Sequence, residues 1–276
     1  MLYENSVSES YLHGNLLNAI QTSLGKLGKT TDTVTVEDLG PADEFHIGGR
    51  LATKSFLDQL NFSKKDHILD VGCGLGGAAR FVADQYGSSV TGIDLSQEYT
   101  DTGKALSNWV KLGKQITLQQ GSALSMPFED NTFDGGYMLH VGMNIEDKAK
   151  LFAEISRVLK PGATFGVYDI MRFKEGELTY PVPWATVNGT NKLATLDQYK
   201  SALIAAGFEV SKVNNRRDFA LDFFKQMRAK NEANGGPPPL GLHTLMKEST
   251  PAKLKNMVDS IAADYIAPVE IIAQKG

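Results

Sequence analysis

Four glycines that follow a short apolar strand constrain the fold of this chain more than any other feature. Residues 66–77 read Asp-His-Ile-Leu-Asp-Val-Gly-Cys-Gly-Leu-Gly-Gly, which places glycines at Gly72, Gly74, Gly76 and Gly77. A glycine has no Cβ, so a loop of this kind lets the backbone come close to a ligand. Gly72, Gly74 and Gly77 satisfy the G-x-G-x-x-G spacing of dinucleotide-binding βαβ folds, but the glycines alone do not decide which nucleotide binds.

The carboxylate of Asp70, two residues before Gly72, narrows the choice of ligand. A pyrophosphate binds to helix N-terminal N–H groups and gains nothing from a carboxylate at the end of the strand. A ligand with a cationic amino group and no phosphate tolerates or favours one. S-adenosylmethionine (SAM) is such a ligand, because it combines adenosine, a sulfonium and an α-amino acid end. The loop therefore predicts a SAM site in preference to an NAD site.

A second carboxylate, Asp94, ends the next apolar strand and lies 22 residues beyond Gly72. At this spacing a βαβ nucleotide fold places an acid against the ribose hydroxyls. Asp94 could instead cap the helix that follows, since Asp is a good N-cap residue. Both roles are compatible, and the pairing of glycine loop and acid favours the ribose role.

Length and composition are typical of a globular protein. The chain has 276 residues, of which 42% are hydrophobic and 22% charged, and this suits one enlarged domain or one domain with a lid. A formal charge of −4 gives no general reason to expect nucleic acid or an anionic membrane as a partner. We find no signal-peptide pattern and no apolar stretch of the roughly 20 residues that a membrane span needs. We therefore expect a cytoplasmic protein.

Cysteine and histidine usage points to neither a disulfide nor a metal site. The single cysteine, Cys73, excludes an intrachain disulfide and is compatible with a reducing compartment. It lies inside the glycine loop, where packing of a small side chain under the turn explains it. The five histidines form no close pair with metal-ligand spacing, so we expect no metal.

From residue 66 onward, short apolar runs alternate with helical segments. The expected strands are 67–71, 90–93, 116–120, 133–139, 164–169, 208–213 and 269–273. Helical spacing is clearest in 77–85 and in 148–159, where Lys160-Pro161-Gly162 stops the helix. This alternation predicts an α/β fold with a doubly wound, seven-stranded, mostly parallel sheet of the Rossmann-like type.

Two helical segments lie outside that core. The expected division is 1–62 as an N-terminal helical cap, 63–216 as the SAM-binding core, 217–267 as a helical lid insert, and 268–276 as the final strand of the core. Within the insert, Phe223, Phe224 and Met227 share an apolar face. We expect the insert to cover the site of the methyl acceptor, since inserts near strand C-termini commonly cover sites in this architecture.

Together these motifs resemble class I SAM-dependent methyltransferases, over about residues 45–215 and the last strand. Residues 70–77 are similar to the first motif of the family, and 91–96 to its ribose-binding motif. Residues 121–128 resemble the segment that holds the adenine, and 157–162 resemble the turn before the fifth strand. Within the class, the chain looks most like small-molecule enzymes of the sarcosine/dimethylglycine, tocopherol and quinone-biosynthesis types.

The resemblance implies the cofactor-binding residues. They are Asp70, Gly72, Gly74, Gly76, Asp94, Leu95, Ser122, Ala123 and His140. The chain departs from the family at Ser122, where an acid often binds the adenine amino group. A hydroxyl can accept the same hydrogen bond without charge assistance, so the contact should be weaker.

Three residues are candidates for catalysis: His140, His46 and Asn144. His140 lies just past the fourth strand, beside the expected methyl position, and its side chain suits proton transfer. Alternatively, its backbone holds the amino acid end of SAM and its ring only packs. His46 contacts the substrate or caps a helix, and Asn144 binds the substrate or holds its own loop. Trp184 walls a pocket or lies in the core, whereas Arg80 is expected at the surface or between helices.

We therefore expect a SAM-dependent methyltransferase that acts on a small-molecule acceptor at N, O, S or C. Two alternatives remain open, namely a non-catalytic SAM-binding regulatory protein and an NAD(P)-dependent oxidoreductase. The sequence identifies neither the acceptor nor the oligomeric state, and a homodimer is possible.

Overall fold

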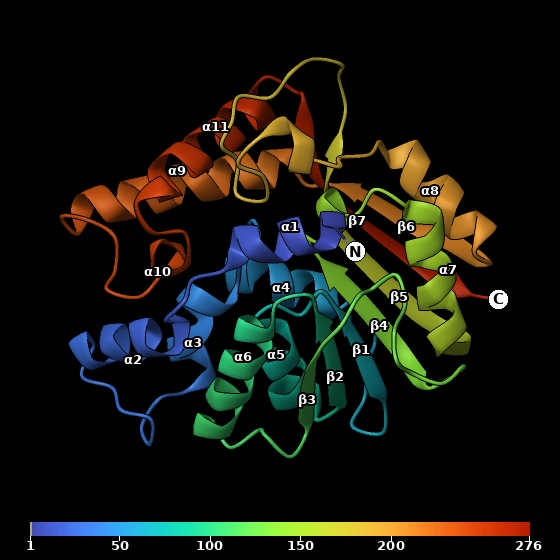
Figure 1. Cartoon of the computed structure of the whole chain (residues 1–276), viewed down its shortest axis with the longest axis horizontal. Coiled ribbons are helices and arrows are strands. Elements are labelled where there is room, and N and C mark those ends of the chain that lie inside the picture. Colours follow the sequence, from blue (N-terminus) through green and yellow to red (C-terminus); the bar gives the residue numbers. More distant parts are fainter. Residues whose placement is uncertain (1) are drawn as a thin grey trace.

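The structure, a computed structural model, describes residues 2–276 and contains one seven-stranded sheet (Figure 1). The strands are β1 (His67–Val71), β2 (Ser89–Asp94), β3 (Ile116–Gln120), β4 (Phe133–Leu139), β5 (Leu159–Arg172), β6 (Phe208–Asn215) and β7 (Ile266–Lys275). Their order across the sheet is β3-β2-β1-β4-β5-β7-β6, and β7 runs antiparallel to both of its neighbours. The predicted doubly wound, mostly parallel sheet is confirmed.

Helices flank the sheet (Figure 1). They are α1 (Leu2–Tyr11), α2 (Leu16–Lys26), α3 (Val36–Asp43), α4 (Gly49–Leu57), α5 (Gly77–Tyr86), α6 (Gln97–Trp109), α7 (Lys148–Val158), α8 (Leu196–Ala205), α9 (Arg217–Ala233), α10 (Leu242–Met246) and α11 (Thr250–Ala262). Short 3₁₀ turns lie at η1 (Gly142–Asn144), η2 (Asn188–Thr190) and η3 (Lys247–Ser249).

The central strands are apolar because both faces of the sheet are covered. On β1, Leu69 and Val71 join a core cluster with residues of α7 and α8, whereas Ile68 joins a second cluster with residues of α4 and α5. Neighbouring residues of a strand point to opposite faces, so β1 contributes to both cores. The apolar residues Ile68, Leu69 and Val71 of β1 follow from this position.

Four strands are longer than the sequence predicts, and β5 and β7 are extended most. Helix α7 ends at Val158, one residue before the predicted limit, and β5 begins at once with Leu159, which pairs with Phe133. An irregularity in the register then separates this pair from the pairing of Gly135 with Thr164. Because hydrogen bonding to neighbouring strands extends β5 and β7 beyond their apolar segments, both exceed the expected 164–169 and 269–273.

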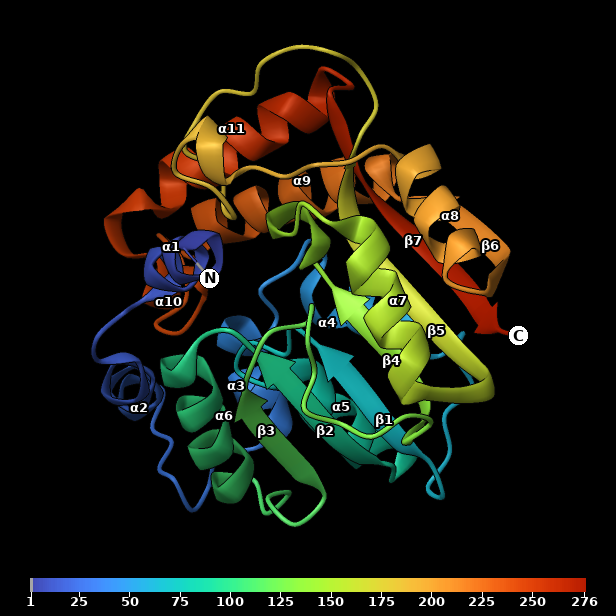
Figure 2. The same cartoon turned by 45° about the vertical axis from the view of Figure 1, so that its right-hand side comes forward.

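The segments before β1 and between β6 and β7 are helical, as expected. Helices α9 and α11 lie side by side, and α1 lies below them toward the sheet (Figures 1 and 2). Helix α1 reaches the loops that leave two strands: the Ser8 hydroxyl donates to Leu95 O (3.4 Å) after β2, and the Tyr11 hydroxyl donates to Asn144 Oδ1 (2.9 Å) after β4. This helix therefore covers part of the carboxyl edge of the sheet.

Candidate active site

A cavity of about 380 Å³ lies at the carboxyl ends of β1, β2 and β4. The chain leaves β1 toward β2 on one side and returns to β4 on the other, and ligands of doubly wound sheets bind where the strand order reverses in this way. Most of the predicted site residues line this cavity, namely His46, Asp70, Gly72, Gly74, Asp94, Leu95, Ala123, His140 and Asn144. The structure thus brings together residues from five separate parts of the sequence.

Glycine is needed at Gly72 and at Gly74 for different structural reasons. Gly72 has a φ of +69°, and a Cβ at this position would lie 2.4 Å from Cγ2 of Val141. Gly74 has a φ of +53°, but a Cβ there would meet only the ring of Tyr99, at 3.9 Å. Gly72 is therefore required by packing within the protein, and Gly74 is the position where the loop leaves room at the cavity.

Asp94 joins the end of β2 to the glycine loop. Its Oδ2 accepts the backbone N–H of Gly74 (2.9 Å), and its Oδ1 accepts the N–H of Ser96 (2.8 Å). Ser96, not Asp94, is the N-cap of α6, because its side chain accepts the N–H of Tyr99 (3.3 Å). Each carboxylate oxygen has room for a second donor. Asp94 can therefore accept hydroxyl groups at the cavity without losing its backbone bonds.

Asp70 is buried at the end of β1, and Oδ2 of its carboxylate accepts the hydroxyl of Tyr137 (3.1 Å). Burial raises the pKa of Asp70 to about 7, and the hydrogen bond from Tyr137 opposes this rise. The negative charge of Asp94 adds to it. A cationic group in the cavity would favour the ionised form of Asp70, so this carboxyl is suited to a ligand with an ammonium.

His140 has an unusual conformation directly after β4. Its φ is +54°, a left-handed conformation that is uncommon outside glycine, and its N–H donates to Tyr168 O (2.7 Å). Both ring nitrogens are buried and have no hydrogen-bond partner among the described residues. Burial lowers the pKa of His140 well below its usual value, and the neighbouring His46 lowers it further. The ring is therefore neutral, and its two unsatisfied nitrogens favour a ligand that supplies a partner.

His46 also lines the cavity, with its ring 5.9 Å from that of His140. Its Nε2 lies 2.9 Å from Thr53 Oγ1 and 3.4 Å from Glu44 Oε2. Burial lowers the pKa of His46, although the charge of Glu44 opposes this. Unlike His140, His46 has polar partners within the protein, which hold it in the turn between α3 and α4.

Asn144 is buried at the end of η1 and is hydrogen-bonded on both sides of its amide. Its Nδ2 donates to Trp184 O (2.8 Å), and its Oδ1 accepts the hydroxyl of Tyr11 (2.9 Å). The Tyr3 hydroxyl donates to the backbone oxygen of Asn144 (3.0 Å). These bonds fix α1 and the segment around Trp184 against the loop after β4, so Asn144 holds the structure of the site.

Two of the predicted cofactor-binding residues, Gly76 and Ser122, do not line the cavity. Gly76 is the N-cap of α5, with a φ of +75°, and a Cβ there would lie 2.8 Å from Leu118. The Ser122 hydroxyl donates to the carboxylate of Glu4 on α1 and accepts the N–H of Leu124 (3.1 Å). Packing accounts for Gly76, and hydrogen bonds to α1 and within its own turn account for Ser122.

Burial decides between the alternative positions that the sequence left open for Arg80 and Trp184. Arg80 is not at the surface: its side chain is fully buried between helices and forms an ion pair with Asp43 (2.6 Å). Trp184 lies in a core cluster with residues of α9 and α11 and does not line the cavity. Its Nε1 donates to Asn191 Oδ1 (2.9 Å). Of the two roles considered for Trp184, the core role is the one in the structure.

The sequence predicts an N-terminal helical cap at residues 1–62, but it does not assign the lining of the cavity to α1. This helix lines the cavity with Tyr3, Glu4, Val7, Ser8 and Tyr11. The positions recur at helical spacing, so their pattern marks one face of a helix and could have been found. The aromatic rings of Phe45 and Tyr99 were also missed, and each lies near the Tyr11 ring, at 6.2 and 6.1 Å between centroids.

The insert between β6 and β7 contributes less to the cavity than expected. Leu245 is its one residue among the described residues that line the cavity. Phe224 is buried in the core cluster with Trp184, and Phe223 and Met227 pack against that cluster. The apolar face of α9 therefore serves packing.

The described residues contain neither a metal-binding cluster nor a helix suited to span a membrane. Within residues 2–276, no group of three or more His, Cys, Asp or Glu side chains could hold a metal ion. None of the helices in that range combines the length and apolar character needed to cross a membrane.

Comparison with known proteins identifies the domain. Residues 69–167 match a family model described as a methyltransferase domain. The methyltransferase phqN of Penicillium fellutanum is 29% identical over 163 residues, which cover 57% of this chain and 50% of phqN. A probable chloroplastic tocopherol O-methyltransferase of Oryza sativa subsp. japonica is 38% identical over 100 residues, or 36% of this chain and 28% of that protein. This chain spans about half the length of the first curated relatives.

A solved structure has the same fold along the whole chain. It is the geranyl diphosphate C-methyltransferase from Streptomyces coelicolor A3(2), in complex with Mg²⁺, geranyl-S-thiolodiphosphate and S-adenosyl-L-homocysteine. The TM-score is 0.72 at 17% identity, and the match covers 100% of this chain and 99% of that one. These findings confirm the predicted resemblance to class I methyltransferases and the fold.

Proposed function

We propose that this chain, which carries a class I methyltransferase domain, transfers the methyl group of SAM to a small metabolite. One observation carries the proposal: a single cavity at the carboxyl edge of the sheet joins Asp94, Asp70 and the unsatisfied His140.

The residues around the cavity suit SAM in three places. Asp94 has free acceptor capacity for the ribose hydroxyls, and Leu95 with Ala123 offers an apolar slot for the adenine. Asp70 suits the ammonium of the amino acid end, because a cation would favour its ionised form. Gly74 leaves room for the ligand between these groups.

The chemistry asks little of the protein beyond alignment. SAM, when bound, would supply a methyl group on a sulfonium, a leaving group that departs as a neutral thioether. The cavity can hold an acceptor in line with that group, and orientation of this kind lowers a barrier by roughly 7–11 kcal/mol. His140 is neutral and can take up the proton that a hydroxyl or amine acceptor loses.

Calorimetric titration with SAM and with NAD tests the choice of ligand. We expect binding of SAM and of S-adenosylhomocysteine, and no binding of NAD. Turnover of methyl-labelled SAM with a metabolite extract then separates a methyltransferase from a non-catalytic SAM-binding protein. Binding of NAD without SAM would favour an oxidoreductase and refute the proposal.

The role of His140 is tested by His140→Asn, because asparagine tolerates a positive φ. We expect kcat to fall by about 10²–10⁴-fold, since general-base catalysis contributes this range, with the Kd of SAM within about threefold of wild type. His67→Asn is the matched control, because His67 does not line the cavity. Equal kcat values in both variants would mean that the His140 ring only packs.

The proposal extends to location, assembly and the insert. We propose that the protein acts in the cytoplasm and that it forms a homodimer. Light scattering after size-exclusion chromatography would detect the dimer.

We also propose that residues 217–267 border the entrance for the acceptor through Leu245. Leu245→Trp should then raise the KM for the acceptor and leave the Kd of SAM unchanged.

A further inference from the structure

The charged side chains that line the cavity are of one sign. The acids are Glu4, Asp43, Asp70, Asp94, Glu146 and Asp147, and none of the described residues that line the cavity is lysine or arginine. The two histidines, His46 and His140, add no positive charge near pH 7, because burial lowers the pKa of each. Among the described residues, the lining of the cavity therefore offers no cationic side chain to an anionic ligand.

Two basic side chains beside the lining are paired with its acids. Arg80 is fully buried and is held by Asp43 at 2.6 Å. Lys192 pairs with Glu146 at 3.2 Å, and its ammonium lies 5.1 Å from the centre of the Tyr3 ring. These contacts neutralise two of the lining acids, and among the described residues neither of these two cations is itself part of the lining.

Two helix N-termini at the cavity are also occupied. At α6, the Ser96 side chain accepts the N–H of Tyr99, and at α7, Asp147 Oδ1 accepts the N–H of Lys150 (2.8 Å). A free helix N-terminus would bind a phosphate through such N–H groups. The carboxylate of Asp147 blocks this at α7 and repels an anion as well.

The uncharged part of the lining is apolar and aromatic. Val7, Tyr11, Phe45 and Leu245 come from three separate segments and share the cavity wall. SAM itself is compatible with this environment, because its carboxylate comes with its own ammonium and with a sulfonium. An acceptor with a phosphate or an unpaired carboxylate would lose its hydration and face the acids without a partner, which is costly in a partly desolvated site.

We propose that the methyl acceptor of this protein carries no negative charge, and that it is an uncharged or protonated small molecule with a hydroxyl or amine as the nucleophile. The proposal rests on the function proposed above and narrows it. It separates this chain from the solved relative, whose crystals hold a diphosphate analogue. The unsatisfied nitrogens of His140 fit such an acceptor, since a neutral imidazole accepts a hydrogen bond from O–H or N–H.

The first test separates a metabolite extract by ion exchange into anionic, neutral and cationic fractions. Each fraction is incubated with the protein and methyl-labelled SAM. We expect labelled product from the neutral or the cationic fraction and none from the anionic fraction. Labelled product from the anionic fraction alone would overturn the proposal while leaving the methyltransferase function intact.

The second test needs no knowledge of the true acceptor. The complex with S-adenosylhomocysteine is titrated with matched pairs, geraniol against geranyl diphosphate and phenol against phenyl phosphate. We expect the uncharged member of each pair to bind at least tenfold more tightly. Equal or tighter binding of the phosphorylated members would overturn the proposal.

A charge-reversal variant links the selectivity to the cavity. Glu146 lies at the rim with its side chain 75% exposed, so Glu146→Lys should be tolerated and should raise the affinity for phenyl phosphate at least threefold. Glu37→Lys makes the same change on an exposed part of α3, away from the cavity, and should have no effect. A similar gain in both variants, or in neither, would show that the charge of the lining does not set the choice. Failure of the protein to bind S-adenosylhomocysteine at all would instead refute the proposed function.

Discussion

At the scale of single residues, burial sets the protonation states around the cavity. Asp70 has a pKa of about 7, against 3.8 in the unfolded chain, so its favourable contribution to stability is present below about pH 4 and is lost as the pH rises to 7. His140 has a lowered pKa, so its contribution is present above about pH 6.5 and is lost as the pH falls, when the unfolded chain takes up a proton. As the pH changes, the contributions of Asp70 and His140 to folding stability therefore change in opposite directions.

The raised pKa of Asp70 predicts that SAM binding releases a proton. At pH 6, Asp70 is mostly protonated in the free protein, and the ammonium of a bound ligand would ionise it. Titration calorimetry in two buffers of different ionisation enthalpy should therefore show release of up to about one proton at pH 6 and little at pH 8.5. Asp70→Asn is the control and should abolish the release. Equal release in the variant would exclude Asp70 as its source.

The two backbone bonds of Asp94 predict the effect of a conservative change. Asp94→Asn keeps one acceptor oxygen for Gly74 or Ser96 and removes the charge. We expect SAM binding to weaken by about 1.5–3 kcal/mol, the contribution of a hydrogen bond to a charged group. Calorimetry gives the affinity, and circular dichroism checks that the variant is folded. An unchanged Kd would exclude the ribose from this position.

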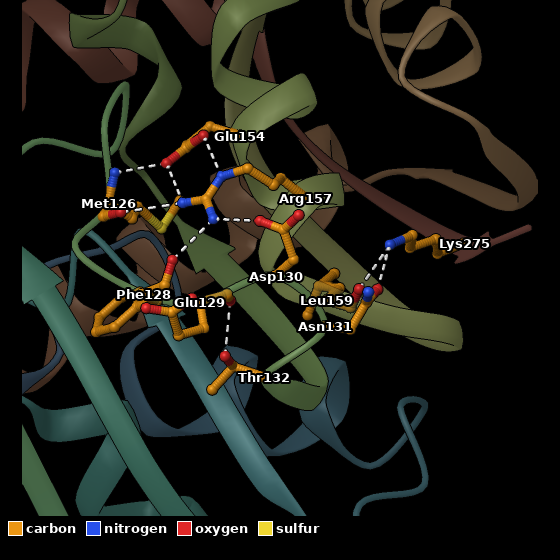
Figure 3. A network of polar contacts seen from close by, with 10 residues as sticks. All are labelled: Met126, Phe128, Glu129, Asp130, Asn131, Thr132, Glu154, Arg157, Leu159 and Lys275. Atoms are coloured by element: carbon orange, nitrogen blue, oxygen red, sulfur yellow. Dashed lines mark hydrogen bonds and ion pairs between the residues drawn. The ribbon is translucent and has the colours of Figure 1, made fainter.

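At the scale of elements, the loop between β3 and β4 is clamped to α7 by one arginine (Figure 3). Arg157 Nη1 donates to Phe128 O (2.8 Å) and to Asp130 Oδ1 (2.7 Å), and its Nη2 donates to Met126 O (3.0 Å). Glu154 accepts from the Nε and Nη2 atoms of Arg157 and also from the N–H of Met126. The clamp fixes the loop that carries Ala123 to the cavity.

Loss of this clamp should loosen the loop. Arg157→Ala removes a planar fork that lysine cannot replace, so we expect Arg157→Ala and Arg157→Lys to behave alike. Each should lower the free energy of unfolding by about 1–2 kcal/mol and speed hydrogen exchange in residues 122–128. Urea unfolding and exchange measured by mass spectrometry check the two effects. Full stability of Arg157→Lys would show that charge alone holds the loop.

At the scale of the whole molecule, a buried ion pair joins the N-terminal helices to the core. Arg80 on α5 donates to both oxygens of Asp43 on α3, through Nε (3.2 Å) and Nη2 (2.6 Å). Its Nη1 donates to Gly103 O (3.1 Å) and Ser107 Oγ (3.0 Å) of α6. One side chain thus ties three helices together beside the glycine loop.

Removal of one partner should therefore cost more than removal of both. Arg80→Met leaves Asp43 buried without its cation, and we expect a loss of about 3–5 kcal/mol in the free energy of unfolding. The double variant Arg80→Met/Asp43→Leu removes both charges and should recover part of that loss. Urea denaturation of the single and double variants measures the coupling. Strictly additive effects would argue against a linked pair.

The fold was predictable from the sequence because its rules are local. Apolar runs alternate with helical stripes, and a parallel sheet with both faces covered is the architecture that buries them all. The glycine loop, Asp70 and Asp94 lie on consecutive strands, so the carboxyl edge of the sheet brings them together once the topology is known. The class of the domain followed from these residues.

The covering of the site was decided by tertiary structure. Nothing near Ser122 in sequence indicates that its hydroxyl is hydrogen-bonded to Glu4. Likewise, nothing near Asn144 indicates that its side-chain amide is hydrogen-bonded to Tyr11 and to Trp184. These contacts join residues more than 100 positions apart or in separate segments, so no local pattern encodes them. The same holds for Arg80, whose burial depends on the position of α3.

The sequence by itself determined the sheet, the cofactor loop and the two acids, because each depends on spacing within about 30 residues. Only the tertiary structure decided which helix covers the cavity and which charges face a ligand. Helix α1 covers the cavity because Ser8 and Tyr11 bind the loops after β2 and β4. The apolar faces of α9 and α11 instead pack against each other and against the core. Burial of side chains by distant segments is a property of the assembled fold, and it sets both the shape and the charge of the site.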